Sequence, residues 1–177
     1  DDLIRGYANS LFYLVAGTLM NLILTIPAAY ALSKKRLMGR GFFMVFLLIT
    51  MYVSGGTIPT FIVVKNLGLL DTRWAVILSS GIATSNLIIA RTFFQSSIPS
   101  ELEESAEIDG ASTMQTLIKI VLPLSKALIG VITLYYAVGR WNEYISALYY
   151  QPTADEMWPL QMVLRRILLQ TKQLANY

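Results

Sequence analysis

The sequence predicts an all-α protein, built as a polytopic membrane helical bundle. Of its 177 residues, 55% are hydrophobic and only 14% are charged, whereas soluble domains carry about 25% charged residues. The mean hydropathy of +0.54 agrees with this depletion of charge. Two uncharged apolar runs exceed the length of about 20 residues that a membrane-spanning helix needs. The alternative, a set of buried helices in a large soluble protein, explains such repeated long runs poorly.

Four apolar segments, taken in chain order, predict four spanning helices. The first two contain no charged residue over 22 and 23 positions, respectively. The third reaches spanning length when it continues past Arg91, and the fourth carries only Lys126. A lysine near a helix end can extend its ammonium group to the membrane interface, so Lys126 is compatible with a span. The expected helices cover residues 11–32, 42–64, 74–94 and 120–139.

The charge of the connecting segments predicts the orientation. Residues 33–41 contain four Lys or Arg and no acidic residue, and short basic loops of this kind stay in the cytoplasm. Counting spans from there places a connector of residues 97–119 in the cytoplasm and an outer loop of residues 140–177 outside. Residues 1–10 then also lie outside, and the chain does not cross the membrane again after its fourth span. We therefore expect a fragment that lacks one helix at each end.

Glycine and polar residues inside the expected spans are candidates for a substrate path. Irregular backbone is tolerated at membrane depth only where protein or water satisfies it, so a Gly-Gly pair marks the second span. Pro27 in the first span is equally compatible with a simple packing kink. Intramembrane polar groups either hold helices together or contact a substrate, and aromatic pairs either fill a core or stack against sugars. The candidate residues are Gly55, Gly56, Ser85, Asn86, Tyr135 and Tyr136.

The cytoplasmic connector predicts two short helices joined by a tight turn. Ser100 and Glu103 have the spacing of a capping box, and Ser112 and Gln115 repeat it. The Asp109-Gly110 pair between them is typical of a helix end, because glycine adopts the left-handed conformation without strain. In the second helix, apolar residues at i, i+3, i+4 and i+7 predict one apolar face. That face consists of Met114, Leu117, Ile118 and Val121.

The charge of the connector indicates the kind of partner that it fits. Five carboxylates and no Lys or Arg lie between Ser97 and Ser112. So dense an acidic segment is a poor lipid-binding surface, because cytoplasmic leaflets are themselves anionic. A basic groove on another protein suits it better. The alternative, a solvated helix whose charges only keep it soluble, does not account for two capping boxes around a glycine.

Composition argues against an enzyme or a metal centre. The chain contains no Cys and no His, which removes thiolate chemistry, the commonest metal ligand and the usual general base. Glu104 and Asp109 are the strongest candidates for an acid–base pair, but five positions apart on a helix they lie on different faces. The sequence has no GxxxxGK[ST] phosphate-binding loop. We therefore expect no catalytic residue, no metal and no ATPase site in this chain.

The outer loop ends in an expected amphipathic helix. Its apolar residues recur at helical spacing, with Arg165-Arg166 on the other side. Such a helix either lies on lipid or docks a partner, and composition does not separate the two. The apolar positions are Leu160, Val163, Leu164, Ile167 and Leu168.

The connector carries a motif that resembles the EAA motif of ABC-importer permeases. Glu104-Ser105-Ala106 is followed after three residues by Gly110, after nine more by Ile120, and then by Leu122-Pro123. Ser105 stands where the family commonly has Ala. Further segments resemble the carbohydrate-importer branch, a maltose-type, binding-protein-dependent family, and most closely its oligosaccharide and lipo-oligosaccharide subgroup. Among them are Asn9-Ser10-Leu11, Ile58-Pro59, Leu67–Thr72, Phe93-Phe94, Ile98-Pro99 and Trp141-Asn142.

This resemblance implies a MetI-like helical core in a bacterial plasma membrane. It implies a second homologous permease, a cytoplasmic ABC ATPase dimer that uses ATP and Mg²⁺, and an extracytoplasmic solute-binding protein that delivers a sugar or oligosaccharide. The runner-up function is a non-transport membrane scaffold or receptor subunit. Glu104 to Gly110 would be the coupling helix that sits in the ATPase. The coupling residues implied are Glu104, Ser105, Ala106, Asp109, Gly110, Ala111, Ile120, Leu122 and Pro123.

Overall fold

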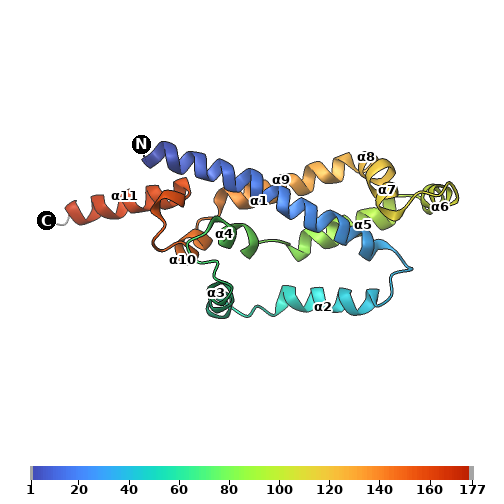
Figure 1. The fold of residues 1–177 in the computed structure, drawn as a ribbon, viewed down its shortest axis with the longest axis horizontal. Helices are drawn as coiled ribbons and strands as arrows, with labels where there is room; N and C mark the ends of the chain where they lie inside the picture. The colour runs from blue at the N-terminus through green and yellow to red at the C-terminus, as the bar shows by residue number, and fades with distance from the viewer. Residues whose placement is uncertain (1, 176–177) are drawn as a thin grey trace. The chain divides into compact units, whose positions relative to one another are not determined.

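The computed structural model describes residues 2–175, and every regular element in that range is helical (Figure 1). The chain divides into two compact units, which we describe separately. Unit 1 consists of residues 1–20, 55–81 and 136–177, and unit 2 of residues 21–54 and 82–135. The expected all-α fold is confirmed.

The first helix, α1, runs from Asp2 to Ser33 and starts nine residues before the expected span. The apolar pattern continues through Leu3 and Ile4, and Asp2 lies in the first turn, where a negative charge favours helix formation. Pro27 lies inside α1 without ending it. Among the described residues, α1 alone is long and apolar enough to cross a membrane by itself. The number of candidate spans rises to four when each of three interrupted helix pairs is counted as one.

The second apolar segment is interrupted. Instead of one helix over 42–64, the structure has α2 (Arg40–Tyr52) and α3 (Thr57–Asn66). Gly56 has a φ of 84°, in the left-handed region that favours glycine, and it directly precedes α3. The Gly-Gly pair identified in the sequence therefore does interrupt this segment.

The third segment, expected as one helix over 74–94, is also two helices. α4 (Arg73–Ser79) begins where the Thr72 hydroxyl accepts a hydrogen bond from the Ala75 amide. α5 runs from Thr84 to Ser97. The break between α4 and α5 falls among small and polar residues, which gain little from continuing a helix.

The fourth segment was expected as one helix over 120–139, but it begins and ends elsewhere. α7 (Thr113–Thr116), a π-helical turn (Leu117–Val121) and α8 (Leu122–Leu124) precede α9 (Lys126–Asn142). The chain turns by 87° between α8 and α9. Proline tolerates only the start of a helix, because it lacks an amide hydrogen. Pro123 is placed accordingly, in the first positions of α8.

The outer loop is largely helical. It contains α10 (Ile145–Tyr150), a 3₁₀ turn (Asp155–Met157) and α11 (Leu160–Ala175). The expected amphipathic helix is present, but its buried residues are Met162 and Val163. The expected apolar positions 164, 167 and 168 are exposed in this chain.

The N-terminal turns of α1 hold the outer loop in unit 1. The Asn9 amide donates to the Glu156 and Trp158 carbonyls at 2.8 and 3.1 Å. The Ser10 hydroxyl accepts from the Leu160 amide at 2.9 Å and thereby caps α11. The hydrophobic core of unit 1 consists of five buried residues: Tyr13, Val76, Ile77, Ala147 and Met162.

The core of unit 2 joins the second half of α1 to α5 and α9. Tyr30 and Phe94 are both buried and meet edge to face, with ring centroids 5.9 Å apart. Such aromatic pairs add about 0.5–1.5 kcal/mol beyond the area that they bury. Leu87, Ala90 and Ile132 are also fully or nearly fully buried. This packing fixes the end of α1 against α5, next to the connector of residues 97–119.

Candidate functional site

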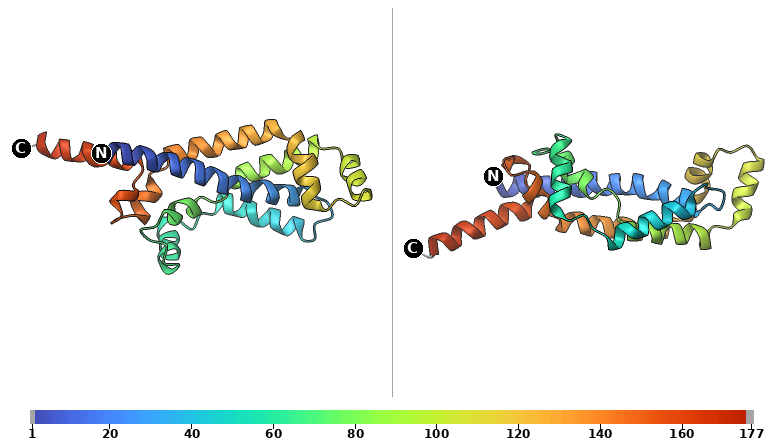
Figure 2. Two further views of the ribbon diagram at one scale, coloured as in Figure 1. Left: turned by 45° about the horizontal axis from the view of Figure 1, so that its top comes forward. Right: turned by 90° about the horizontal axis from the view of Figure 1, so that it is seen from below.

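The candidate site is the connector, whose first helix is α6 (Ser100–Ile108). α6 lies crosswise to α5 and to the C-terminal part of α1 (Figure 2). Pro99 occupies the N-cap position, and no side chain within residues 2–175 caps this end. The expected Ser100–Glu103 capping box is therefore wrong. Glu103 instead bonds to Lys34, because a lysine ammonium within reach is a stronger partner than a backbone amide.

The turn after α6 is closed by hydrogen bonds at every position. The Gly110 amide donates to the Glu107 carbonyl at 3.0 Å, and the Ala111 amide donates to the Ala106 carbonyl at 2.9 Å. This pair of bonds is a Schellman motif, which needs a left-handed residue, and Gly110 has a φ of 80°. The turn is a rigid corner rather than a flexible linker.

A capping box begins α7 as expected. The Ser112 hydroxyl accepts from the Gln115 amide at 3.3 Å, and the Gln115 side-chain oxygen accepts from the Ser112 amide at 2.9 Å. Both helix ends at the corner thus have their backbone groups satisfied. The angle between α6 and α7 is set by local chemistry.

α6 has two different faces. Its inner face carries Ala106, which is 6% exposed, between Glu103 and Glu107. Its outer face is exposed and mixes carboxylates with apolar side chains, of which Ile108 is 86% exposed. The exposed outer residues are Glu101, Leu102, Glu104, Ser105 and Ile108.

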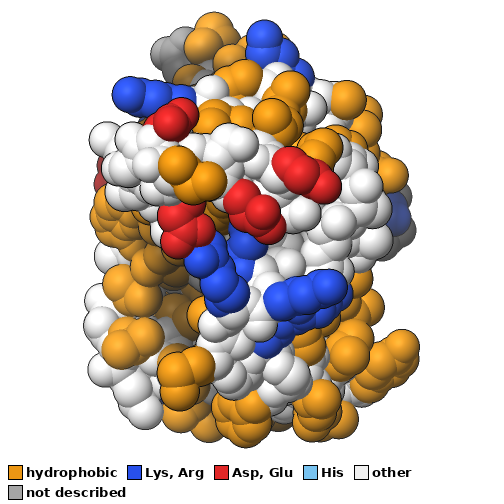
Figure 3. All heavy atoms as spheres, turned by 90° about the vertical axis from the view of Figure 1, so that its right-hand side faces the viewer, with side chains coloured by type: hydrophobic (Ala, Val, Ile, Leu, Met, Phe, Trp, Pro, Cys, Tyr) orange, Lys and Arg blue, Asp and Glu red, His pale blue; other side chains and the backbone are white. Residues whose placement is uncertain are grey.

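Two ion pairs join the inner face of α6 to the loop that follows α1. Lys34 pairs with Glu103, and Arg36 pairs with Glu107 at 2.9 Å. In Figure 3, acidic side chains on the connector lie directly beside Lys and Arg side chains. The hydrogen bond from Arg36, and then its positive charge, lower the pKa of Glu107. The same contacts raise the pKa of Arg36.

The end of α1 is held by α5 as well. The Arg91 side chain donates from Nε to the Leu32 carbonyl at 3.2 Å. The last carbonyls of a helix have no partner inside the helix, and a cation suits the negative end of its dipole. The last turn of α1 itself contains no basic residue, so Arg91 supplies that charge from a neighbouring helix.

Comparison with known proteins identifies the family. The family model described as "Binding-protein-dependent transport system inner membrane component" matches residues 3–167. The chain belongs to this family. We refer to it below as the permease chain.

Individual relatives agree with this assignment. The chain is 48% identical over 164 residues to Protein LplC of Bacillus subtilis (strain 168) and covers 55% of it. It is 47% identical over 169 residues to the polygalacturonan/rhamnogalacturonan transport system permease protein YtcP of the same organism and covers 58% of it. These matches take in 93% and 96% of this chain. The chain thus spans somewhat more than half the length of the relatives it matches.

A solved structure has the same fold. It is the crystal structure of a bacterial ABC transporter involved in the import of the acidic polysaccharide alginate. One chain of it superposes with a TM-score of 0.90 at 39% identity, covering 94% of the permease chain and 59% of its own length. The expected resemblance to carbohydrate ABC-importer permeases, and the MetI-like fold that it implied, are confirmed.

The other expected coupling residues of the permease chain are distributed around the corner. Glu104, Ser105, Asp109 and Gly110 are exposed, whereas Ala106 faces inward. Beyond the corner, Pro123 is exposed, and three residues are partly buried: Ala111, Ile120 and Leu122.

The expected apolar face after the corner is only half buried. Leu117 and Val121 are buried, but Met114 and Ile118 are 57% and 55% exposed. Ile118 lies in the π-helical turn, whose wider i→i+5 spacing changes which side chains share a face, whereas Met114 lies before this turn, in α7. The i, i+3, i+4, i+7 spacing defines one face only in a regular α-helix, so it did not predict the exposure of Met114 and Ile118.

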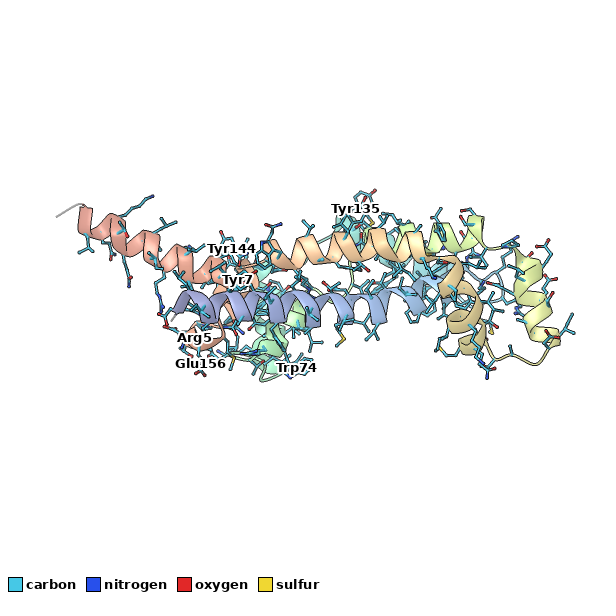
Figure 4. All side chains as sticks on the ribbon, turned by 90° about the horizontal axis from the view of Figure 1, so that it is seen from above. Arg5, Tyr7, Trp74, Tyr135, Tyr144 and Glu156 are labelled. Atoms are coloured by element: carbon cyan, nitrogen blue, oxygen red, sulfur yellow. The ribbon has the colours of Figure 1, made fainter. Side chains whose placement is uncertain are left out.

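The expected path residues fall in both units of the permease chain. In unit 2, Asn86 is buried in α5, Ser85 is exposed, and Tyr135 projects outward from α9 (Figure 4). In unit 1, Tyr136 is buried at 6% exposure, so the two tyrosines do not present one shared surface. Gly55 and Gly56 are exposed at the break before α3. Their role in a path remains a prediction.

Sequence reasoning missed Arg140, which lies in unit 1 near the end of α9. Arg140 is 6% exposed, and its guanidinium donates to the carbonyls of Val76, Ile77 and Ser80 at 3.0, 2.8 and 2.9 Å. These are carbonyls at the C-terminal end of α4. The signal was available, because an arginine that directly follows an apolar run marks a membrane residue with a specific partner.

Proposed function

We propose that the permease chain is a membrane-spanning subunit of an ATP-driven importer that moves a sugar or oligosaccharide. In this proposal it works with a second homologous permease, a cytoplasmic pair of ABC ATPases and an extracytoplasmic solute-binding protein. The ATPases bind and hydrolyse ATP with Mg²⁺, and this chain transmits force without an ATPase site of its own. The observation that carries the proposal is the family match over residues 3–167, which includes the connector and its left-handed Gly110.

The outer face of α6 supplies the proposed contact to the ATPase. Ile108 and Leu102 offer apolar area, and Glu101 and Glu104 offer charge around it. A groove with an apolar floor and a basic rim complements this face, since interfaces bury apolar centres within polar rims. When ATP closes the ATPase pair, the two coupling segments approach each other and the permeases turn outward to receive sugar. The rigid corner allows α6 to transmit that movement.

The substrate class that we propose is an acidic oligosaccharide. The support comes from two relatives, one named for polygalacturonan and rhamnogalacturonan transport and one for import of the acidic polysaccharide alginate. Specificity is shared with the partner permease and the binding protein.

Transport by the intact protein with its partner subunits tests both parts of the proposal. In proteoliposomes, we expect ATP-dependent uptake of oligogalacturonate and little uptake of a neutral maltooligosaccharide of equal length. Uptake of the neutral sugar alone would refute the substrate class but keep the importer. If no ATPase co-purifies after gentle extraction and no sugar is taken up, the chain is instead a scaffold or receptor subunit.

A further inference from the structure

The two ion pairs at α6 cross a gap that side-chain packing does not fill. Cavities of about 580 and 690 Å³ open on either side of them. Lys34, Arg36, Glu103 and Glu107 line both cavities. In this part of unit 2, charged side chains therefore bridge the space between α6 and the end of α1.

The Lys34–Glu103 pair is the stronger of the two. Its side chains are 24% and 18% exposed, against 79% and 58% for Arg36 and Glu107. Exposed pairs contribute little, because water and salt screen them, whereas partial burial preserves the attraction. Lys34 also lies 4.2 Å above the centre of the Tyr30 ring, a favourable position for a cation. Tyr30 in turn packs edge to face on Phe94.

The contacts run from α6 to Lys34 and Arg36, then to the end of α1, and from there to α5. Glu103 and Glu107 lie one turn apart on the inner face of α6, so both carboxylates point to the same side. Lys34 and Arg36 directly follow α1, whose end is fixed to α5 by Arg91. A displacement of α6 would pull on Lys34, and Lys34 would pull on the end of α1.

We infer that the Lys34–Glu103 and Arg36–Glu107 pairs are the link through which movement of α6 reaches the end of α1. This inference rests on the proposed coupling function and adds a second route beside the covalent one through α7 and α8. Lys34 and Arg36 are then positioning residues: they act through α6 and do not contact the ATPase.

A charge swap tests the link in the intact importer reconstituted in proteoliposomes. Lys34→Glu and Glu103→Lys each remove the stronger pair, and together they restore it in reverse. The matched control combines Lys35→Glu with Glu103→Lys, because Lys35 is an exposed neighbour of Lys34 and this control has the same net charge as the swap. The first measurement is the amount of sugar imported per ATP hydrolysed. The second is crosslinking of an Ile108→Cys probe to the ATPase.

We expect each single variant to import less sugar per ATP by about fivefold or more, which is the lower end of typical coupling between sites. The swap should return to within about twofold of the unchanged protein, and the control should not. A purely structural role for Lys34 would change assembly and crosslinking together, without selective loss of import per ATP.

The outcomes separate the link from the proposed function. If the Ile108→Cys probe crosslinks normally but the swap restores no more than the control, the link is refuted and the docking of α6 stands. The link is likewise refuted if the single variants import normally. If the probe never crosslinks in the otherwise unchanged protein, the docking of α6 is refuted and the link falls with it.

Discussion

At the scale of single residues, Arg140 and the end of α4 satisfy each other. A buried guanidinium is costly unless its donors are paired, and the last carbonyls of a helix lack partners within it. Three hydrogen bonds of 2.8–3.0 Å give the Arg140 guanidinium its acceptors and give the carbonyls at the end of α4 a donor. Gly17 makes room for this arrangement, because a Cβ there would lie 2.6 Å from Arg140 Nε.

Gly17→Ala should therefore destabilise the permease chain by about 1–3 kcal/mol, the usual cost of overpacking. The added methyl group displaces a guanidinium that three carbonyls hold in place. Thermal unfolding of the detergent-solubilised protein measures the effect. Gly130→Ala is the control, since its Cβ would meet nothing within 4 Å in the part of the chain that the structure describes, and alanine favours a helix. Equal melting temperatures for the two variants would contradict the tight approach.

Arg36→Gln should raise the pKa of Glu107 toward its ordinary value. Arg36 lowers that pKa by hydrogen bonding and by charge, so in the unchanged protein the pair adds stability above the unfolded-state pKa of Glu107. That contribution disappears as the pH falls through the lowered pKa. Carbon-13 chemical shifts of labelled glutamate, followed through an acid titration, report the change. Lys35→Gln serves as control, and an unchanged Glu107 titration in Arg36→Gln would disprove the pairing.

At the scale of helices, the sequence predicted the apolar segments better than the breaks within them. Hydropathy averages over about 20 residues and reports only that a segment is apolar. The Gly55-Gly56 break carried its own local signal. The break after α4 falls among small and polar residues, and it is also stabilised by Arg140, which lies 60 residues away in the chain and donates to the Ser80 carbonyl, a contact that local sequence does not reveal. The bend in the fourth segment, between Leu124 and Lys126, was missed because the sequence is mostly apolar on both sides of it.

The corner between α6 and α7 gives the sharpest test at this scale. Gly110→Val places a β-branched residue at a φ of 80°, which costs roughly 1–2 kcal/mol or more. Among the described residues, a Cβ at Gly110 meets no atom within 4 Å, so conformation rather than space is the obstacle. We expect normal membrane insertion, weakened ATPase co-purification and loss of uptake. Gly110→Asn is the control, because asparagine tolerates the left-handed region. Full transport by Gly110→Val would rule out the corner as a coupling element.

The structure also determines where a crosslinking probe belongs. From the motif alone, Ala106 would be chosen as a contact to the ATPase, but it faces the interior of unit 2. Ile108 on the outer face is the position that can reach a partner. The motif predicted the corner and its residues. It did not predict which side of α6 faces outward, because that depends on the ion pairs with Lys34 and Arg36.

At the scale of the whole molecule, orientation is the property that loop charge predicts. We expect Lys35 and Glu104 on the cytoplasmic side and Leu67 outside, by the positive-inside rule. Because these 177 residues contain no Cys, single Cys substitutions give clean probes. A membrane-impermeant maleimide applied to intact cells should label Leu67→Cys and leave Glu104→Cys unlabelled until the membrane is permeabilised. Labelling of both from the outside would overturn the orientation.

The three hydrogen bonds from Arg140 to the end of α4 form a joint whose chemistry determines how this contact responds to pH. A guanidinium keeps its proton throughout the pH range of living cells, and backbone carbonyls do not titrate at all. A joint made from a carboxylate or an imidazole would loosen or tighten as the surrounding medium becomes acidic. The three Arg140 hydrogen bonds therefore do not respond to acidity, in contrast to the neighbouring contact in which the Ser80 hydroxyl donates to the Glu143 carboxylate at 3.1 Å.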